Sequence, residues 1–355
     1  MINSIYLYNN INSNKRKENE NKNLVIFLIN KIRNFKLSAF NLFIIIIYIS
    51  FIATIIFIKE DFLIKHLIKI KLIKSEINKR DLKVCVCTLA KLENKYIREF
   101  VEHYKNYGID KIFLYDNNDI DGETFEEVIN DYIQNGFVQI LNWRGRHKAL
   151  YHIMNNCYRK NFHYYDWLIF YEIDEYIHLF DYKNIKLFLN QTKFNNCQQI
   201  YLNLVCHTDN NLLVYENKSL AKRFPHHVPI TKKAGKYLEM KTIIRGHYKG
   251  IHISNNHLGD IRLRSCNSSG KYESLFGHYS HNSDQKYYYI DHYYSKSTEE
   301  FIIKITKGDP LRPEKDYIIE RIEKYFNQNE ITKEKIDMIE QKVHINLDKY
   351  RKTIQ

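Results

Sequence analysis

The sequence is poor in glycine, proline and cysteine. Its 355 residues include 11 Gly, 4 Pro and 6 Cys, against 29 Tyr and a large share of Asn, Ile and Lys. This bias is typical of drift towards AT-rich codons, so the formal charge of +13 carries little weight by itself. Six scattered cysteines are too few for a disulfide-rich scaffold. No internal repeat is visible, which argues against a repeat protein.

The basic residues also lack the pattern of a nucleic-acid-binding protein. Lysines are spread along the chain, and no aromatic-basic RNA signature occurs, so we expect no nucleic-acid partner. Weak attraction to acidic membrane surfaces or phosphorylated substrates is the more modest inference. A hydrophobic content of 44% is enough for a core, and 27% charged residues argues against general disorder.

The first eighty residues differ from the rest of the chain. Residues 1–36 are rich in Asn and Lys and predict a disordered, basic cytoplasmic tail. Residues 39–58 contain no charged side chain. This uncharged run is long enough to cross a bilayer and longer than the apolar region of a signal peptide. We therefore predict a transmembrane signal anchor at 37–58, followed by a basic stem at 59–80.

Basic residues flank both sides of this anchor, so the positive-inside rule discriminates little. The short N-terminal tail favours a single-pass type II protein whose catalytic domain faces the Golgi or ER lumen. Asn190, Asn217 and Asn267 begin glycosylation sequons, which fit a lumenal domain but arise by chance in an Asn-rich chain.

From residue 83 onward, strand and helix patterns alternate. Strand-like segments at 84–90, 111–116, 137–143 and from 167 are separated by helical segments at 93–107, 122–135 and 147–160. Strands joined by helices of this length indicate right-handed βαβ units. We predict an α/β fold at 81–312, with a Rossmann-like, mostly parallel sheet flanked by helices, and further helices in the segment 313–355.

Residues 167–179, WLIFYEIDEYIHL, predict a buried strand that breaks into the carboxylates Glu172, Asp174 and Glu175. Acids at the end of a buried strand cost desolvation energy unless a positive group neutralises them. Mg²⁺ or Mn²⁺ meets this need, because each takes hard oxygen ligands and leaves positions open for phosphate. A solvated turn is the alternative. Ligands of such sheets bind beyond the carboxyl ends of the strands, where Asp116 and Arg144 also fall.

The chain resembles glycosyltransferase family 92, a GT-A-like group, over about two-thirds of its length. The matching segments are 94–104 (NKYIREFVEHY), 115–118 (YDNN), 172–176 (EIDEY), 207–210 (HTDN), 223–224 (RF) and 291–301 (DHYYSKSTEEF). The resemblance implies a transferase that uses a nucleoside diphosphate sugar, with a UDP-sugar expected, and a glycan or glycoprotein acceptor. It also implies a membrane anchor, an Asp-x-Asp-like metal motif and inversion, and makes galactose a candidate for the transferred sugar.

Two departures from the family pattern stand out. Glu172 occupies a position where Asp is commoner, although Glu remains an oxygen ligand. Lys307 precedes Gly308 where the family often has an Arg-Gly pair, which could alter contact with phosphate or acceptor.

The predicted metal site consists of Asp174, Glu172 and His292. Asp174 is the first choice for direct ligation, and Glu172 acts directly or through water. His292 is favoured as third ligand because the matching family segment carries it, and His278 is the second choice. The alternative for any histidine here is a surface residue or a hydrogen-bonded core residue.

The predicted substrate-binding residues are Asp116, Asn117, Arg144, Arg146, Lys148, Arg223, Lys296 and Lys307. Asp116 ends the second strand and suits hydrogen bonds to uracil or ribose, but a turn-capping Asn/Asp cluster would look the same. The basic residues after the third strand precede a helix N-terminus, a natural diphosphate-facing position, or form a solvated loop. Asp209 and Glu175 are the candidates for the acceptor base.

Two further interpretations compete with this enzyme. One is a catalytically inactive, membrane-tethered carbohydrate-binding or scaffold protein on the same fold. The other, a metal-dependent phosphate hydrolase, requires more clustered His and Asp ligands than the spacing shows. Among the cysteines, Cys85 and Cys87 are expected to be small core residues on one face of a strand. Disulfides among Cys157, Cys197, Cys206 and Cys266 are left open.

Overall fold

The computed structural model describes residues 81–146, 150–229, 237–255, 257–273, 279–281, 288–307 and 314–354, together with Ile26 and Ile47. The chain divides into two compact units, Met1–Lys79 and Arg80–Gln355. Apart from Ile26 and Ile47, the predicted tail, anchor and stem lie outside the described residues. In the part of the chain that is described, no helix combines the length and hydrophobicity that a bilayer crossing requires.

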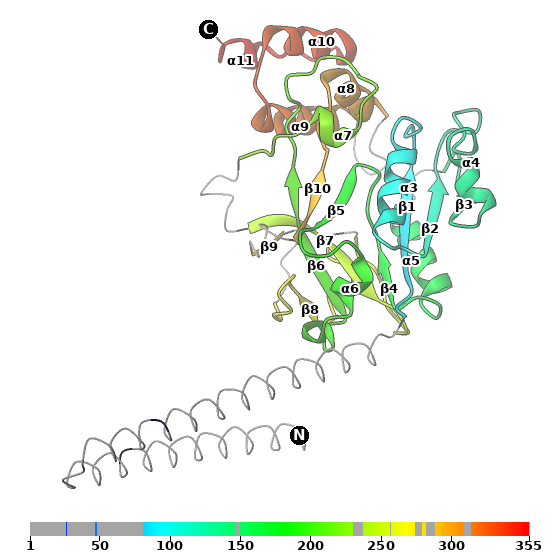
Figure 1. Ribbon diagram of the computed structural model, residues 1–355. Coiled ribbons are helices and arrows are strands. Elements are labelled where there is room, and N and C mark those ends of the chain that lie inside the picture. Colours follow the sequence, from blue (N-terminus) through cyan, green and yellow to red (C-terminus); the bar gives the residue numbers. More distant parts are fainter. Residues whose placement is uncertain are drawn as a thin grey trace, which may run out of the picture. The chain divides into compact units, whose positions relative to one another are not determined.

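One sheet forms the body of the second unit (Figure 1). Its strands follow the order β3-β2-β1-β4-β7-β6-β10-β5, with β8 beside β6 and β9 beside β7. They are β1 (Val84–Ala90), β2 (Lys111–Asp116), β3 (Val138–Asn142), β4 (Trp167–Ile169), β5 (Glu175–Leu179), β6 (Gln199–Cys206), β7 (Tyr237–Arg245), β8 (Ser265–Cys266), β9 (Tyr279–His281) and β10 (Tyr288–His292). The pairs among β1 to β4 are all parallel, as predicted. The other half is mixed, because β7 runs antiparallel to β4 and β6, and β5 antiparallel to β10.

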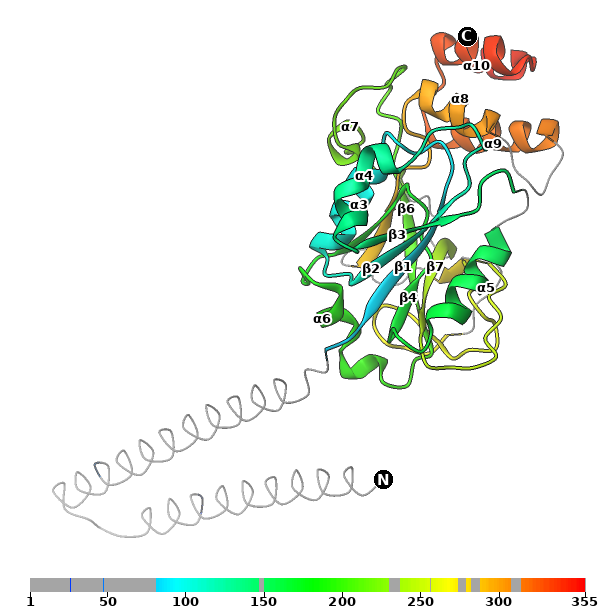
Figure 2. The ribbon, with the colours of Figure 1, turned by 90° about the vertical axis from the view of Figure 1, so that its right-hand side faces the viewer.

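Helices cover both faces of this sheet, which confirms the α/β class. They are α3 (Ile97–Asn106), α4 (Glu126–Gln134), α5 (Leu150–Asn161), α6 (Ile185–Leu189), the short η1 (Thr192–Phe194), α7 (Leu220–Arg223), α8 (Thr298–Thr306), α9 (Glu314–Gln328), α10 (Lys333–Val343) and α11 (Asp348–Arg351). Seen from the side, α3 and α4 lie on one face and α5 on the other (Figure 2). The alternation of β1 explains this: Val86 packs in the core of the α3 face, and Cys87 in the core of the α5 face.

The strand predicted from residue 167 is shorter than its apolar run, and a second strand, which was not predicted, follows Glu172 and Asp174. β4 ends at Ile169 in the middle of the sheet, and β5 begins at Glu175 on its edge. The two segments carry no Gly or Pro between them, so the sequence gives no local turn signal. The place of β5 is set instead by its pairing with β10, in which Glu175 faces His292. The connection from residue 170 to 174 therefore carries Glu172 and Asp174 from the centre of the sheet to its edge.

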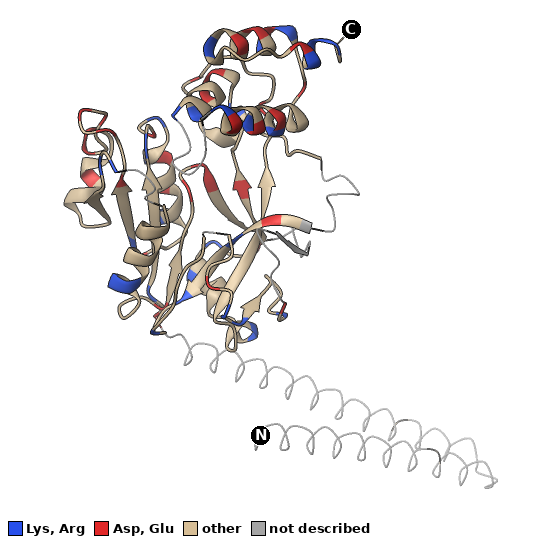
Figure 3. Cartoon of the chain, turned by 180° about the vertical axis from the view of Figure 1, so that it is seen from behind, with Lys and Arg blue, Asp and Glu red and all other residues tan. Residues whose placement is uncertain are grey.

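The C-terminal helices form a separate apolar cluster with α8. In Figure 1 they gather at the end of the sheet towards which β10 points, and in Figure 3 they are dense in both basic and acidic residues. The predicted capping residues do begin α8: the Ser297 side chain and the Glu300 side chain cap each other's backbone N–H groups. Asp209, after β6, joins this cluster to the sheet through Lys335 Nζ at 2.7 Å and the Tyr325 hydroxyl at 2.6 Å.

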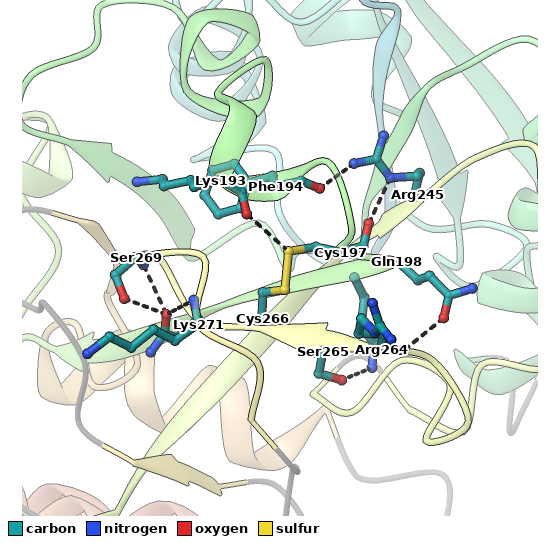
Figure 4. Close-up of a disulfide and its surroundings, with 12 residues drawn as sticks. Lys193, Phe194, Cys197, Gln198, Arg245, Arg264, Ser265, Cys266, Ser269 and Lys271 are labelled. Carbon is teal, nitrogen blue, oxygen red and sulfur yellow. Dashed lines mark hydrogen bonds between the residues drawn. A yellow bond between two sulfur atoms is a disulfide. The ribbon is translucent and has the colours of Figure 1, made fainter. Parts of the chain in front are cut away.

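Two disulfides lie in the described unit, Cys87–Cys157 and Cys197–Cys266. The first joins β1 to α5, so Cys87 is more than the small core residue expected from sequence. Cys85 is a buried free thiol. The second joins the segment after η1 to β8 (Figure 4). Beside it, Arg245 of β7 donates hydrogen bonds to the carbonyl oxygens of Phe194 at 2.7 Å and Cys197 at 2.8 Å.

Candidate active site

A pocket of about 370 Å³ opens where β1 and β2 end, and α8 and α9 form part of its wall. Its acidic lining residues are Glu93, Glu172, Asp174, Glu175 and Glu239, and its basic lining residues are Lys91, Lys241, Lys304, Lys307, Arg321 and Lys324. His257 and His292 are its histidines, and Tyr151, Tyr294 and Tyr317 its tyrosines. The predicted acids of the connection between β4 and β5 thus lie in one cavity with many cations, which suits a polar, anionic ligand.

Lys241 holds two of these acids. Its Nζ lies 2.9 Å from both Glu172 Oε1 and Glu175 Oε1, and its side chain is only 1% exposed, whereas that of Glu172 is 45% exposed. Glu175 Oε2 also accepts a hydrogen bond from the Glu172 N–H at 3.0 Å. Burial raises the pKa of Glu175 to about 8, although Lys241 opposes the change. Burial by itself would raise the pKa of Glu172, but the attraction of the Lys241 ammonium group for the carboxylate is stronger and holds the pKa below its usual range.

Asp174 lies between a lysine and a histidine. Its Oδ2 is 2.6 Å from Lys304 Nζ and 3.8 Å from His292 Nε2. Burial disfavours the charged carboxylate, but Lys304 holds the pKa of Asp174 well below its usual range. Burial lowers the pKa of His292 to about 4, so its imidazole is neutral at pH 7. Both groups are therefore in the protonation state that metal ligation requires.

The ring nitrogens of His292 differ in their surroundings. Nδ1 lies 3.9 Å from Cys206 Sγ, whereas Nε2 is buried and has no hydrogen-bond partner among the described residues. Two ligands at about 2.0–2.2 Å from one ion can span the 3.8 Å between Nε2 and Asp174 Oδ2. The pair therefore fits a divalent cation. Cys206, Glu239 and His292 also place three possible ligand atoms within 4.8 Å of one another.

The predicted nucleotide-binding residues do not share one cavity. Asp116 pairs with Arg144 Nη1 at 2.7 Å, and both line a second, more open depression of about 430 Å³. Asn117 lines the pocket and donates to the carbonyl oxygens of Trp143 and Arg146. Arg146 is exposed and lies over the Trp143 ring at 4.5 Å. Lys148 and His278 lie outside the described residues.

The remaining predicted residues divide between the pocket and the core. Lys307 lines the pocket and pairs with Glu93 at 2.7 Å. Lys296 is buried, with its Nζ 3.5 Å from the centre of the Tyr96 ring. Arg223, 1% exposed, pairs with Glu300 at 2.6 Å and belongs to the core.

Asp209 is not among the residues that line the pocket. Its side chain is 2% exposed and faces Lys335 and Tyr325, so the structure does not bring it to the other predicted catalytic residue, Glu175.

Sequence reasoning missed the pocket's basic residues Lys241, Lys304, Arg321 and Lys324. Lys241 offered a signal, since it interrupts the apolar strand of β7 and a buried lysine needs an acidic partner. Lys304 likewise interrupts an apolar run in α8. Arg321 and Lys324 lie in a charged amphipathic helix, where nothing in the local sequence distinguishes a pocket-facing cation from a solvated one.

Comparison with known proteins identifies the family. The family model of glycosyltransferase family 92 matches residues 80–347, which include all the predicted site residues and α9. The chain belongs to glycosyltransferase family 92. The resemblance found in the segments between residues 94 and 301 is therefore confirmed. The family match also covers Arg321 and Lys324, the two α9 cations of the pocket wall.

A family 92 relative and two solved structures show how far the likeness extends. A glycosyltransferase family 92 protein of rice (Oryza sativa subsp. japonica) is 30% identical over 98 residues, which cover 27% of this chain and 16% of the rice protein. S. aureus TarS in complex with UDP-GlcNAc matches with 10% identity and a TM-score of 0.36, over 76% of this chain and 77% of that chain. Another TarS structure matches with 12% identity and a TM-score of 0.31, over 70% of this chain and 43% of that chain.

Proposed function

We propose that the chain transfers a sugar from a nucleoside diphosphate sugar to a glycan acceptor, with a divalent cation as cofactor and inversion at the sugar. The family supports the reaction class. The observation that supports the metal requirement is the pair formed by Asp174 Oδ2 and His292 Nε2, which lie 3.8 Å apart in the pocket; Nε2 has no hydrogen-bond partner among the residues that the structure describes.

Several charged groups of the pocket have a place in this proposal. Asp174 and His292 would hold Mn²⁺ or Mg²⁺, which supplies positive charge against the departing diphosphate. Lys307, Arg321 and Lys324 line the same cavity and add fixed positive charge, so a donor such as a UDP-sugar is neutralised on several sides. Glu172, the more exposed acid, faces the cavity while Lys241 fixes its carboxylate.

Glu175 is our proposal for the acceptor base. It lines the pocket, and a pKa of about 8 makes it more basic than an ordinary glutamate. Glu175→Gln keeps the size of the side chain but cannot take a proton. We expect the variant to lose transfer and the rising limb of its pH profile while it retains donor binding. A variant with the wild-type pH profile would remove Glu175 from this role.

The decisive experiment is a screen of nucleotide sugars with the full-length protein, with UDP-galactose tested first, in Mn²⁺, in Mg²⁺ and after chelation. We expect transfer that depends on the metal, together with thermal stabilisation by UDP only when the metal is present. Asp174→Asn should lose both effects. If the wild-type protein shows neither, the inactive carbohydrate-binding or scaffold protein becomes the better description.

We also propose a type II topology with the catalytic domain in the secretory lumen. The uncharged run at 39–58 supports an anchor, and the two disulfides fit an oxidising compartment. Asn190 and Asn217 are exposed, as acceptors of glycans must be, whereas Asn267 is buried. Protease added to sealed microsomes should leave the C-terminal unit intact, and digestion of that unit would reverse the orientation.

A further inference from the structure

Strand β10 carries a second cluster of metal-ligand side chains on the face opposite His292. Successive residues of a strand point to opposite faces, so Asp291 points away from the pocket. His207, His227 and Asp291 each place one possible ligand atom within 4.8 Å of the others. Asp291 Oδ1 lies 2.7 Å from His207 Nε2 and 3.5 Å from His227 Nε2. A third ring, His178, brings Nδ1 to 3.8 Å from Asp291 Oδ2.

The surroundings of His207 fix its tautomer. Its Nδ1 lies 2.6 Å from the carbonyl oxygen of Phe224, which can only accept a hydrogen bond, so Nδ1 carries the hydrogen. His207 Nε2 faces Asp291 Oδ1 at 2.7 Å, where it donates a hydrogen bond when protonated and offers a lone pair to a metal ion when it is not. A histidine that donates its far N–H to a backbone carbonyl is the usual arrangement of a metal ligand, because the hydrogen bond sets both tautomer and ring orientation.

The cluster is also held rigidly. The His207 N–H bonds to the His292 carbonyl at 3.0 Å, and the Val228 N–H bonds to the Cys206 carbonyl at 2.8 Å. An isolated β-bridge joins His207 to His227. The His207 ring, 4% exposed, stacks on Tyr293 with centroids 4.3 Å apart. Preorganised ligands of this kind lower the entropic cost of binding an ion.

The donor atoms of the cluster suit a divalent ion. Three imidazole rings face the one carboxylate of Asp291. A divalent ion needs only neutral rings and the ionised acid. Two ligands at about 2.0–2.1 Å from a tetrahedral ion lie roughly 3.3 Å apart. His227 Nε2 and Asp291 Oδ1 are 3.5 Å apart, whereas His207 Nε2 and Asp291 Oδ1, at 2.7 Å, must separate by about 0.6 Å to admit the ion.

We infer that His207 Nε2, His227 Nε2 and Asp291 bind a Zn²⁺ ion, with the fourth position open beside His178. Two imidazoles and one carboxylate suit a borderline cation such as zinc, whereas Mg²⁺ prefers oxygen ligands. The ion joins the segments at 207 and 227 to β10, one residue before His292. This site is separate from the proposed cofactor of the pocket, and it stands whether or not the chain transfers sugar.

The test is a zinc titration of the untagged full-length protein after chelator treatment, in competition with a chromophoric chelator and with excess Mg²⁺ present. His227 is 44% exposed, so His227→Ala should fold normally, and we expect it to weaken Zn²⁺ binding at least about tenfold. His247→Ala is the matched control, because His247 is 46% exposed and, within the described part of the chain, its one recorded carboxylate partner is Asp166 at 3.3 Å. Its Zn²⁺ affinity should equal that of the wild type.

Co²⁺ substitution locates the ion. We expect the absorption bands of a tetrahedral cobalt site without a thiolate charge-transfer band, and their loss in His227→Ala. A thiolate band that disappears in Cys206→Ser would place the ion in the pocket and overturn the inference. So would equal Zn²⁺ affinity in His227→Ala and wild type. Absence of stoichiometric binding in the wild type would reduce the cluster to a network of hydrogen bonds.

Discussion

Two buried aspartates of this chain meet lysines in nearly the same way and yet belong to different kinds of site. Asp174 lies 2.6 Å from Lys304, and Asp209 lies 2.7 Å from Lys335. The remaining partners differ. Asp209 also accepts hydrogen bonds from the Tyr325 hydroxyl and the Asn211 N–H, so its oxygens are satisfied within the protein. Asp174 adjoins His292, whose Nε2 has no hydrogen-bond partner among the described residues, and it lines a cavity.

The comparison shows that a buried ion pair alone does not mark a functional site. Such pairs occur in structural joints, where every donor and acceptor is matched. An unsatisfied polar atom beside the pair distinguishes the pocket, because a protein tolerates that cost where a ligand will meet the atom.

The largest expected effect is the loss of activity in the pocket. Asp174→Ala and His292→Ala should each reduce Mn²⁺-stimulated transfer by about 10²-fold or more, the size expected when a charge-stabilising group is removed. The double variant should be little worse than either single variant, because the two residues act as one unit. Initial rates over a Mn²⁺ series measure this, with His247→Ala as control. Losses that multiply would show two independent roles, and normal Mn²⁺ dependence of His292→Ala would pass the ligand role to His278.

The second effect concerns stability. Asp209→Ala leaves the buried Lys335 ammonium hydrogen-bonded to the neutral Asn211 Oδ1 and Glu330 carbonyl oxygens but without its carboxylate, and we expect the free energy of unfolding to fall by about 3–5 kcal/mol. Urea denaturation measures the change. Donor KM, measured well below the unfolding transition, should stay near the wild-type value. A variant with unchanged stability but greatly reduced kcat would return Asp209 to the role of acceptor base.

The third prediction is a gain in metal affinity. Lys304→Met removes the ammonium group that competes with a metal ion for Asp174. We expect Mn²⁺ to bind about tenfold more tightly once this competing cation is removed, which corresponds to about 1.4 kcal/mol of binding free energy. The activation constant for Mn²⁺ and calorimetric titration both report the change. Lys349→Met, which removes an exposed ion pair with Glu323, should leave the affinity as it is. Weaker Mn²⁺ binding in Lys304→Met would show that Asp174 is not the ligand.

The fourth effect is smaller and tests the nucleotide end. Asp116 pairs with Arg144 at the end of β2, beside the pocket residue Asn117. Asp116→Ala should raise donor KM by up to about tenfold, the change expected when one hydrogen bond to a charged group is lost. The fold should persist. Circular dichroism and donor KM are the measurements. An unchanged KM would show that Asp116 only stabilises the turn at 116–119.

The smallest effect concerns His103, a partly buried histidine outside the pocket. Burial lowers the pKa of His103 to about 4, as it does for His292, but His103 Nε2 lies 3.1 Å from the Ile177 carbonyl. Asp291 and His178 are the charged and titratable groups that act on it. The folded state binds a proton less readily than the unfolded state, so stability is full above about pH 6.5 and falls as the pH drops towards 4.

His103→Gln removes this titration and should flatten the fall in that window. Melting temperatures from pH 7 to 4, measured with a chelator present, follow the effect. A variant that loses stability with pH as steeply as the wild type would assign the acid sensitivity to other groups.

The first half of the fold was readable from the sequence because its signals are local. The predicted strands at 84–90 and 111–116 coincide with β1 and β2. Gly108 and Gly136 end their helices with positive φ values of 80° and 79°, which glycine adopts without strain. The first helix nevertheless begins at Ile97 instead of residue 93, since no side chain caps its N-terminus.

The second half depends on pairings between distant residues. β5 follows an apolar segment that reads as a continuation of β4, and only its register with β10 separates the two. The site was predicted in part for the same reason. Asp174 and His292 both line the pocket, and their role as ligands stays a prediction. Lys241 and Lys304 could not be assigned to their acids, because nothing in the sequence brings together residues that are 69 and 130 positions apart.

The contribution of α9 to the pocket has a consequence for biosynthesis. Tyr317, Arg321 and Lys324 leave the ribosome after the whole sheet, because the last strand, β10, ends at His292. At about 5–20 residues per second, synthesis of the stretch from His292 to Lys324 takes a few seconds. Until then the nascent chain has the pocket acids on the connection from β4 to β5 but lacks the α9 wall and the Asp209–Lys335 joint. The cavity is therefore completed only after the sheet has been synthesised, when α9 packs against it.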